Sequence, residues 1–345
     1  MASNTAATQS AGQTPRSAGF YLPAEWEQQA AVWLSWPVSG RNWPDCREEL
    51  LDAYARMAAR ISWCEPVHIN AAAGEHAYIC QRLNRARCDL TVTTVWSHPT
   101  DDVWCRDHGP IFLKHKESGE LAIGDWQFNA WGEKFAPFDQ DDAVPARIAR
   151  ALNCKKFTLD AVLEGGAIES NGAGAVLTTE AVLLNTNRYV EPTLASAEAM
   201  LCEGLGADRV IWLKDGIDND DTDGHIDNVT RFVAPDAVLT VVDPAQPQLQ
   251  INAEQLRRAI GNVIELPLPA AVLHEGRALP ASYANFLILN DAVLVPVFGQ
   301  PSRDAYALGV IADCFPGRKI ESLDARVFLL EGGAIHCLSM QQPAG

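Results

Sequence analysis

The chain has 345 residues, of which 48% are hydrophobic and 21% charged, as in globular proteins, and its formal net charge is −17. This acidity argues against nucleic acid and anionic membrane surfaces as partners, and no apolar stretch approaches the length of a membrane span. The nine cysteines are scattered singly without a CxxC pair, which argues against a disulfide framework or a zinc ribbon and favours reduced thiols in a cytoplasmic protein.

Residues 1–18 consist mainly of Ala, Ser, Thr, Gln and Gly and contain no apolar core. Such a composition cannot bury enough apolar surface to fold, and it lacks the apolar segment of a secretory signal. We therefore expect a disordered leader over residues 1–18. No linker-like stretch interrupts residues 19–345, which predicts a single α/β domain there.

From residue 20 onward the sequence repeats the order strand, strand, helix, strand. Runs of β-branched and aromatic residues indicate the strands, and apolar residues three to four positions apart indicate the helices. The first unit has a strand at 31–36, a helix capped by Asp45 that extends to Ile61, and a strand at 66–71. Each of the four later units is predicted as two strands, a helix and a third strand, in that order. Their ranges are 111–113, 121–123, 144–148 and 156–159; 174–177, 181–184, 194–205 and 210–213; 230–233, 237–241, 253–260 and 262–266; and 285–288, 292–295, 304–314 and 319–321.

Two kinds of internal similarity support this repeat. The hexapeptide Leu-Glu-Gly-Gly-Ala-Ile occurs at 163–168 and again at 330–335, and the turns at 234–239 and 289–294 have the same pattern. A repeat of about 60 residues gives five ββαβ units, the first of them degenerate. Such units close most simply into a ring, so we expect an α/β fold of the five-bladed α/β-propeller type. Functional side chains would then gather on the axis, where the loops of all units converge.

Four short stretches, at 102–110, 163–172, 218–228 and 331–343, concentrate the residues suited to chemistry. The last is a strand-like apolar run that follows a pair of glycines, a place where rigid scaffolds present functional side chains. Cys337 in this run is the best candidate for a nucleophile, because the other stretches supply His and carboxylate groups that activate a thiol. An isolated cysteine would instead be interpreted as a small buried hydrophobic residue.

His225 and Asp227 lie two positions apart in the third stretch. If this stretch is a strand, both side chains project to the same side. Taken alone, they would be interpreted as surface residues of an acidic turn. The several aspartates of 218–223 also suggest calcium, but the spacing lacks the bidentate Glu that ends an EF-hand loop, so no metal site is predicted.

Several carboxylates are predicted close to the thiol of Cys337, namely those of Asp107, Glu164 and Asp227. Negative charge raises the pKa of a thiol and weakens it as a nucleophile, which argues against a protease. The arrangement is reasonable if the substrate carries the compensating positive charge. A guanidinium presents five N–H donors in a planar fork that two carboxylates can bind, which would place its central carbon against the thiolate.

Five motifs of the sequence together resemble one known family. They are Trp-x-Arg-Asp-x-Gly-Pro at 104–110, Glu-Gly-Gly-Ala-Ile-Glu at 164–169, Asp-x-Thr-Asp-Gly-His-Ile-Asp-Asn at 220–228, Tyr-Ala-Asn-Phe at 283–286 and Glu-Gly-Gly-x-Ile-His-Cys at 331–337. In this order they are similar to the agmatine deiminases, a family that includes bacterial-type peptidylarginine deiminases and belongs to the guanidine-modifying superfamily. The resemblance covers residues from about 20 to 343 and implies a five-bladed α/β-propeller, in agreement with the repeats.

The resemblance implies a role for each residue of the cluster. Cys337 becomes the nucleophile, and His225 the general acid and base, with Glu164 as the carboxylate that orients it. Asp107 and Asp227 become the pair that binds the guanidinium.

Other positions of the motifs are less decisive. Asn285 is similar to a residue that lines the site, but a turn asparagine explains it equally well. Trp104 would pack on the methylene stem of the substrate, or be an aromatic residue of the core. Ala334 departs from the glycine frequent at this position in the family, which suggests a stiffer loop beside the nucleophile. His336 should face away from Cys337 if the two alternate along a strand, so it receives no catalytic role.

The implied activity is hydrolysis of a small cationic guanidino compound without a metal or organic cofactor. Agmatine is the expected substrate, with N-carbamoylputrescine and ammonia as products, as in putrescine and polyamine biosynthesis. Its distal ammonium would suit the acidic residues Asp218, Asp220 and Asp221. Deimination of free or peptidyl arginine is the alternative, and a non-catalytic binder of guanidino compounds is a further one. The sequence does not determine the oligomeric state, and a homo-oligomer is compatible with it.

Overall fold

The computed structural model describes residues 12–43 and 45–345, in which the strands form five sheets of three or four strands and one separate two-stranded hairpin. Each of the five sheets contains an antiparallel pair whose second strand is followed, through a helix, by a parallel neighbour. A parallel neighbour requires such a crossover connection. This is the ββαβ order that the sequence predicts.

The first two units share the N-terminal half of the chain. The first consists of β2 (Gln29–Ser35), α1 (Arg47–Ser62), β3 (Val67–Ala71), α2 (His76–Arg85), β4 (Thr93–Ser97) and, from the far end of the chain, β19 (Ser339–Pro343). The second consists of β1 (Phe20–Tyr21), α3 (Cys105–His108), β5 (Ile111–His115), β6 (Leu121–Gln127), α4 (Ala130–Glu133), α5 (Asp139–Asp142), α6 (Val144–Leu152) and β7 (Lys155–Val162).

The other three units follow in chain order. The third has β8 (Glu169–Ser170), β9 (Ala175–Thr179), α7 (Glu180–Leu183), α8 (Leu194–Leu205) and β10 (Arg209–Leu213). The fourth has β11 (Thr230–Ala234), β12 (Ala237–Val242), α9 (Pro247–Ala259) and β13 (Asn262–Pro267). The fifth has β16 (Leu287–Ile288), β17 (Ala292–Val297), α10 (Pro301–Cys314) and β18 (Lys319–Asp324), preceded by the hairpin of β14 (Leu273–His274) and β15 (Arg277–Ala278).

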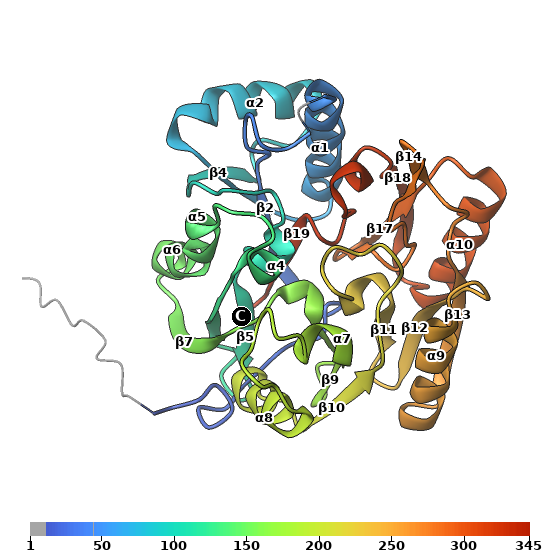
Figure 1. Ribbon diagram of the computed structural model, residues 1–345. Helices are drawn as coiled ribbons and strands as arrows, with labels where there is room; N and C mark the ends of the chain where they lie inside the picture. Colours follow the sequence, from blue (N-terminus) through green and yellow to red (C-terminus); the bar gives the residue numbers. More distant parts are fainter. Residues whose placement is uncertain (1–11, 44) are drawn as a thin grey trace, which may run out of the picture.

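The crossover helices lie toward the outside of the molecule and the strands toward its middle (Figure 1). The sheet of the first unit is completed by β19, which pairs antiparallel with β2 so that Ser339 lies opposite Leu34. Because the last strand joins the first sheet, the C-terminal segment is held in the interior next to the beginning of the fold. This pairing brings the stretch that contains Cys337 close to the stretch around Asp107, since the backbone N–H of Arg106 donates to the carbonyl of Cys337 at 3.1 Å.

Local sequence signals explain where the helices lie. Helix α1 buries Leu50, Tyr54, Met57 and Ile61 on one face, as their spacing of three to four residues requires. Its N-cap is Cys46 without a side-chain hydrogen bond, so the expected cap by Asp45 is wrong.

Helix α8 matches the predicted bounds. Thr193 and Ser196 form a capping box at its start, and the helix ends at Gly206 in a left-handed conformation with φ +63°. A β-carbon at Gly206 would lie 1.9 Å from the carbonyl oxygen of Phe20, so only glycine fits.

One predicted strand is a helix. Residues 181–183 belong to α7 and Leu184 is its C-cap; the helix begins where the hydroxyl of Thr179 accepts the N–H of Val182. The hairpin partner of β9 is instead β8, which precedes it in the chain. The turn between them is formed by Asn171, whose side-chain oxygen accepts the N–H groups of Ala173 and Ala175, each at 2.9 Å.

Residues 1–11 of the predicted leader lie outside the described residues. Within its remainder, the backbone N–H of Arg16 donates to the carbonyl of Glu203 at 3.1 Å, and the hydroxyl of Thr14 donates to the Glu203 carboxylate at 2.7 Å. Thr14 and Arg16, which belong to the expected leader, are therefore packed against α8. Among the described residues, no helix combines the length and the apolar character that crossing a membrane requires.

The end of α8 generates a stability prediction. Gly206→Ala should lower the free energy of unfolding by at least ~1–2 kcal/mol, because it adds left-handed backbone strain to the contact with Phe20. Gly309→Ala in α10 is the matched control, since a β-carbon there meets no atom within 4 Å and should stabilise the helix by ~0.5–1 kcal/mol. Thermal unfolding of the two variants and the parent shows whether Gly206→Ala lowers the melting temperature and Gly309→Ala raises it. Equal melting temperatures for Gly206→Ala and the parent would contradict the assigned helix end.

Candidate active site

The residues singled out in the sequence occupy equivalent places in the five units. In every unit the segment directly before the first strand of the ββαβ order supplies at least one of them. These residues are Asp107 before β5, Glu164 before β8, His225 and Asp227 before β11, Asn285 before β16 and Cys337 before β19. All six are buried, with exposed fractions of 4% or less. The convergence expected from the repeats is therefore present as a cluster of buried polar side chains.

A pocket of about 470 Å³ opens onto this cluster. The described residues that line it are Asp102, Trp104, Asp107, Trp131, Phe135, Asp221, Thr222, Glu331, Gly332, Gly333 and Cys337. None of them is basic, and four are acidic. A cation would find compensating charge on this wall, and an anion would not.

Cys337 lies in the turn before β19 and not in the strand itself. Its sulfur accepts the side-chain N–H of Asn285 at 3.0 Å and lies 3.6 Å from Oδ2 of Asp227. Burial raises the pKa of the Cys337 thiol well above its usual range, and the charges of Asp227 and Asp107 raise it further. This environment favours the thiol over the thiolate, and a positive charge in the pocket would oppose the shift.

His225 is held among carboxylates without a hydrogen bond to its ring. Nδ1 lies 3.6 Å from Oδ1 of Asp107, Nε2 lies 4.0 Å from Oε2 of Glu164, and neither nitrogen has a closer partner. The expected strand is a short 3-10 helix at Ile226–Asn228, so the alternation argument for His225 and Asp227 is wrong, although both side chains reach the cluster. An unpaired imidazole between two carboxylates is suited to carry a proton to and from a bound substrate.

A glycine makes the approach of these groups possible. A β-carbon at Gly166 would lie 2.5 Å from Nδ1 of His225 and 2.7 Å from Oδ1 of Asp107. The backbone N–H of Gly166 donates to the same oxygen of Asp107 at 3.1 Å. The second glycine of the Glu-Gly-Gly motif therefore serves close packing beneath the site.

The carboxyl group of Asp107 is fixed from two sides. Oδ2 accepts the indole N–H of Trp131 at 3.1 Å, and Oδ1 accepts the backbone N–H of Gly166. Burial raises the pKa of Asp107 to about 6; nearby His225 opposes this shift, and the charges of Asp227 and Glu164 add to it. Asp107 is thus largely ionised only above pH 6, and a bound cation would extend that range downward.

Asp227 differs from Asp107 in its environment. Burial alone would raise the pKa of Asp227, but the hydrogen bond and charge of His336, with His225 and Arg231 nearby, hold it below its usual range. Oδ2 accepts from His336 at 2.8 Å and from Asn285 at 3.3 Å, whereas Oδ1 is buried without a partner. Asp227 therefore presents one free, ionised oxygen inside the cluster.

Glu164 is anchored by an arginine that the motifs do not contain. Nε of Arg188 donates to Oε1 of Glu164 at 2.7 Å, and the same guanidinium binds Asp223 at 2.7 Å and the carbonyl of Thr222 at 2.9 Å. This leaves Oε2 of Glu164 without a hydrogen bond on the side of His225. Arg188 thus joins the second and third stretches and is unavailable to bind an anionic substrate.

Two predictions about the rim of the site need correction. Asn285 does not line the pocket; it lies behind the thiol, where it contacts Cys337, Asp227 and the carbonyl oxygen of the Asn228 side chain. Asp218 also lies away from the pocket, whereas Asp221 lines it. Trp104 does lie on the pocket wall, packed so closely on Gly333 that a β-carbon there would approach its ring to 2.3 Å.

Trp131 is a pocket residue that the sequence did not reveal. It lies in a left-handed turn in which Ala130, Trp131, Gly132 and Glu133 all have positive φ, between 49° and 88°. Left-handed backbone costs ~1–2 kcal/mol for a residue with a side chain, so the surrounding contacts must impose it. The only local signal is Asn129, whose side chain accepts the N–H of Gly132 at 2.9 Å.

His336 does not face away from the cluster, contrary to the expectation from strand alternation. Residues 332–338 do not form a strand, since 335–338 are turns, and the ring of His336 points at the carboxylate of Asp227. Behind it lies a buried group of charges formed by Glu25, Arg106, Glu169 and Arg231.

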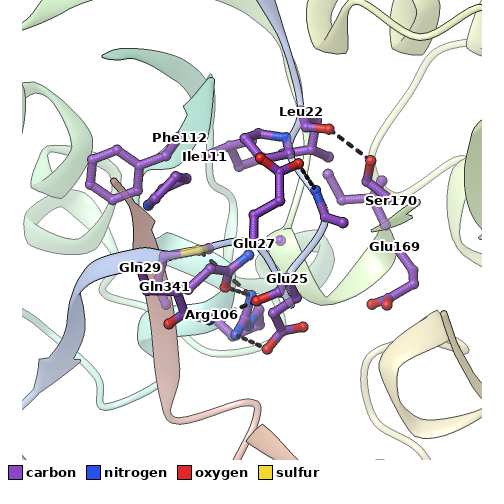
Figure 2. A pocket seen from close by; sticks show the side chains of 16 residues that line it. Leu22, Glu25, Glu27, Gln29, Arg106, Ile111, Phe112, Glu169, Ser170 and Gln341 are labelled. Atoms are coloured by element: carbon purple, nitrogen blue, oxygen red, sulfur yellow. Dashed lines mark hydrogen bonds and ion pairs between the residues drawn. The ribbon is translucent and has the colours of Figure 1, made fainter. Parts of the chain in front are cut away.

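This group of charges borders a second pocket of about 570 Å³ (Figure 2). Figure 2 shows Glu25 and Arg106 facing one another on its wall, with Gln341 bound to the guanidinium of Arg106. Within the described residues, no group of three or more His, Cys, Asp or Glu side chains is arranged to hold a metal ion.

A model of the Porphyromonas-type peptidyl-arginine deiminase family matches residues 21–343, nearly the whole chain. The chain belongs to this family. It is 35% identical to the agmatine deiminase of Pseudomonas fluorescens strain Pf-5, over 96% of this chain and 97% of that protein.

Solved structures agree with this membership. A cysteine-to-serine variant of C. jejuni agmatine deiminase with substrate bound superposes with a TM-score of 0.86 at 31% identity, over 94% of this chain and 97% of that one. The agmatine deiminase of Enterococcus faecalis gives a TM-score of 0.88 at 33% identity, over 98% of this chain and 99% of that one. The mixed α/β fold of this deiminase family is therefore also the fold of this chain.

The electrostatics of the pocket predict how Cys337 reacts. A neutral alkylating reagent such as iodoacetamide should label Cys337 slowly at neutral pH and faster at alkaline pH, because the raised pKa leaves little thiolate near neutrality. A cationic haloacetamidine should label it much faster at neutral pH, because it supplies the missing positive charge. Mass spectrometry of all nine cysteines gives the rates, with the other eight as internal controls. Equal rates for the two reagents at Cys337 would contradict this account.

Proposed function

We propose that this protein is an agmatine deiminase, which hydrolyses the guanidinium of agmatine to N-carbamoylputrescine and ammonia. The observation that carries the proposal is a buried thiol enclosed by carboxylates in a pocket without a basic lining residue. Such a site is incomplete without a cation, and agmatine carries a positive charge at both ends. The relatives named agmatine deiminase support the same assignment.

In the proposed mechanism, Asp107 and Asp227 bind the guanidinium through its N–H groups, using the unpaired oxygen of Asp227. The positive charge lowers the pKa of Cys337, the thiol proton passes to His225, and the resulting thiolate attacks the central carbon to form a carbon–sulfur bond. His225, oriented by Glu164, donates a proton to the departing nitrogen, which leaves as ammonia.

The remaining amidino-thioether is then hydrolysed. His225 removes a proton from water, whose oxygen bonds to the same carbon. The carbon–sulfur bond breaks, which returns the thiolate and releases the ureido product. Every step uses side chains of the cluster, and Asn285 is placed to stabilise the thiolate through its N–H on the sulfur.

The distal ammonium of agmatine would lie toward the mouth of the pocket, where Asp102, Asp221 and Glu331 form part of the wall. Trp104 and Trp131 would enclose the methylene stem between the two charges. We further propose that the five ββαβ units are the blades of a five-bladed α/β-propeller. The support for it is that each unit contributes to the same cluster from the same position. Residues 19–345 would then be one domain of a cytoplasmic enzyme of polyamine biosynthesis, with a homo-oligomer compatible with it.

Deimination of free or peptidyl arginine is the second candidate, and one observation favours it. Arg277, on the hairpin of β14 and β15, lies at the rim and binds Asp221 at 3.2 Å, with 61% of its side chain exposed. It could receive the carboxylate of an arginine. Arg188 and Arg231 cannot, because both are fully buried in ion pairs.

Substrate choice tests the proposal. Agmatine, arginine and a peptide ending in arginine should be assayed side by side for ureido product at one pH and low salt. We expect kcat/KM for agmatine to exceed the others by a factor of about a hundred or more, because an uncompensated carboxylate near like charge costs several kcal/mol. Arg277→Ala should leave agmatine turnover intact. If arginine or the peptide matched agmatine and lost this activity in Arg277→Ala, the second candidate would be correct.

The pair of aspartates generates a separate prediction. Asp107→Asn and Asp227→Asn should each lower kcat/KM at least about tenfold, because each removes a charged hydrogen bond worth ~1.5–3 kcal/mol. In the parent, kcat/KM should fall as the pH drops through about 6, where Asp107 becomes protonated. That acid limb should be missing in Asp107→Asn. Exposed Asp236→Asn is the control, and near-parental kinetics in both site variants would mean that the guanidinium binds elsewhere.

A further inference from the structure

The ring of His336 bridges two carboxylates that belong to different parts of the molecule. Nδ1 lies 2.8 Å from Oδ2 of Asp227, and Nε2 lies 3.1 Å from Oε2 of Glu25. The ring is 1% exposed, and the two carboxylates are 0% and 5% exposed. An ionised carboxylate only accepts hydrogen bonds, and an imidazole has two N–H donors only when it is protonated. Both contacts can therefore be hydrogen bonds only if His336 is an imidazolium or one carboxyl carries a proton.

The surroundings of Glu25 decide between these states. Burial favours the protonated form of Glu25, but Arg231, His336 and Arg106 hold its pKa well below the usual range. Arg231 forms an ion pair with Oε2, and Nη2 of Arg106 lies 3.7 Å from Oε1, on the wall of the second pocket (Figure 2). The ionised form of Glu25 is therefore favoured, and the shared proton belongs on His336 and not on Glu25.

The count of charges gives the same answer. Three carboxylates lie in this buried cluster, those of Glu25, Glu169 and Asp227, beside the two guanidinium groups of Arg106 and Arg231. A protonated His336 makes three positive charges against three negative ones. A neutral His336 would leave one buried negative charge uncompensated, which is costly.

The position of His336 is fixed through its backbone as well. Its N–H donates to Oδ1 of Asn285 at 3.0 Å, and its carbonyl accepts from Nε of Arg106 at 3.3 Å. Asp227 is thus held at one oxygen by His336 and Asn285, and its other oxygen has no partner among the described residues. The remaining groups that face Asp227 are Cys337 at 3.6 Å, with His225, Asp107, Asp220 and Arg231 as nearby charges.

We propose that His336 is a positioning residue that stays doubly protonated between Glu25 and Asp227, and thereby keeps Asp227 ionised with its free oxygen directed at the guanidinium. The inference rests on the proposed function for the identity of the cation, but not for the protonation state of His336. His336 touches no substrate atom in this account, because it acts through Asp227.

Two substitutions of His336 separate the effect of its positive charge from the effect of its hydrogen bond to Asp227. His336→Asn places a neutral N–H donor near the position of Nδ1, so it retains the contact with Asp227 and loses the charge and the contact with Glu25. His336→Gln reaches farther, toward Glu25, and gives up the contact with Asp227. His98→Asn is the matched control, since this buried histidine binds Asn70 at 3.0 Å and lies outside the cluster.

The first measurement is the binding of agmatine by calorimetry, in a Cys337→Ser background so that turnover does not interfere. At neutral pH we expect His336→Asn to weaken binding at least about tenfold and His336→Gln more, with His98→Asn unchanged. The ratio of dissociation constants between His336→Asn and its parent should grow as the pH falls from about 8 to about 5.5, because Asp227 then protonates more readily. Asp107 titrates in both proteins and is coupled to Asp227, so the same ratio is measured with Asp107→Asn in both backgrounds. A ratio of one, or a ratio above one that does not change with pH, would overturn the role of the charge.

The second measurement does not depend on agmatine. In protein labelled at histidine with nitrogen-15, the ring nitrogen shifts of His336, assigned by their loss in His336→Asn, should be those of an imidazolium at neutral pH. Glu25→Gln should move them toward the neutral form, whereas Asp236→Asn, an exposed position outside this buried cluster, should not. A neutral ring in the parent protein would overturn the inference whatever the substrate is. Failure of agmatine turnover with an imidazolium at His336 would count against the proposed function alone.

Discussion

The organisation of this site depends on one electrostatic constraint, the burial of Asp107, Asp227 and Glu164 around the thiol of Cys337. Burial removes the water that would otherwise screen these charges, so each carboxylate raises the cost of forming a thiolate beside it. None of the described residues that line the pocket carries a positive charge. The site consequently lacks a cation that the substrate has to supply, and nucleophile activation becomes linked to substrate binding.

The protein places its own cations behind the carboxylates instead of inside the pocket. Arg188 holds one oxygen of Glu164, and Arg231 with Arg106 holds Glu25, which in turn holds His336 against Asp227. Removing either partner of such a buried pair leaves an uncompensated charge, so these contacts are costly to break even where they add little net stability. They orient the carboxylates so that one oxygen of Glu164 and one of Asp227 stay unpaired inside the cluster. The ion pairs behind the carboxylates thus determine which carboxylate oxygens remain without a hydrogen bond inside the cluster.

The sequence predicted the ββαβ order and the convergence of the motifs because both depend on periodicity and on residue types that the chain displays locally. It failed where long-range contacts override local preference. The segment 181–184 is apolar enough for a strand, but Thr179 starts a helix and Asn171 turns the chain earlier. Strand alternation misplaced His336, because the backbone before β19 forms turns. Trp131 and Glu25 could not be found at all, since the first depends on a left-handed turn imposed by tertiary contacts and the second lies more than 200 residues from its partner Arg231.

The most direct test of the central claim is a titration of the Cys337 thiolate by its ultraviolet absorbance, taken as the difference between the parent protein and Cys337→Ala. It should be recorded with and without a saturating amidinium that cannot be hydrolysed. The account predicts a midpoint well above the ordinary thiol range in the free protein, and a clear shift to lower pH when the cation is bound. A thiolate already present at neutral pH in the free protein, or a midpoint that the cation does not move, would contradict it.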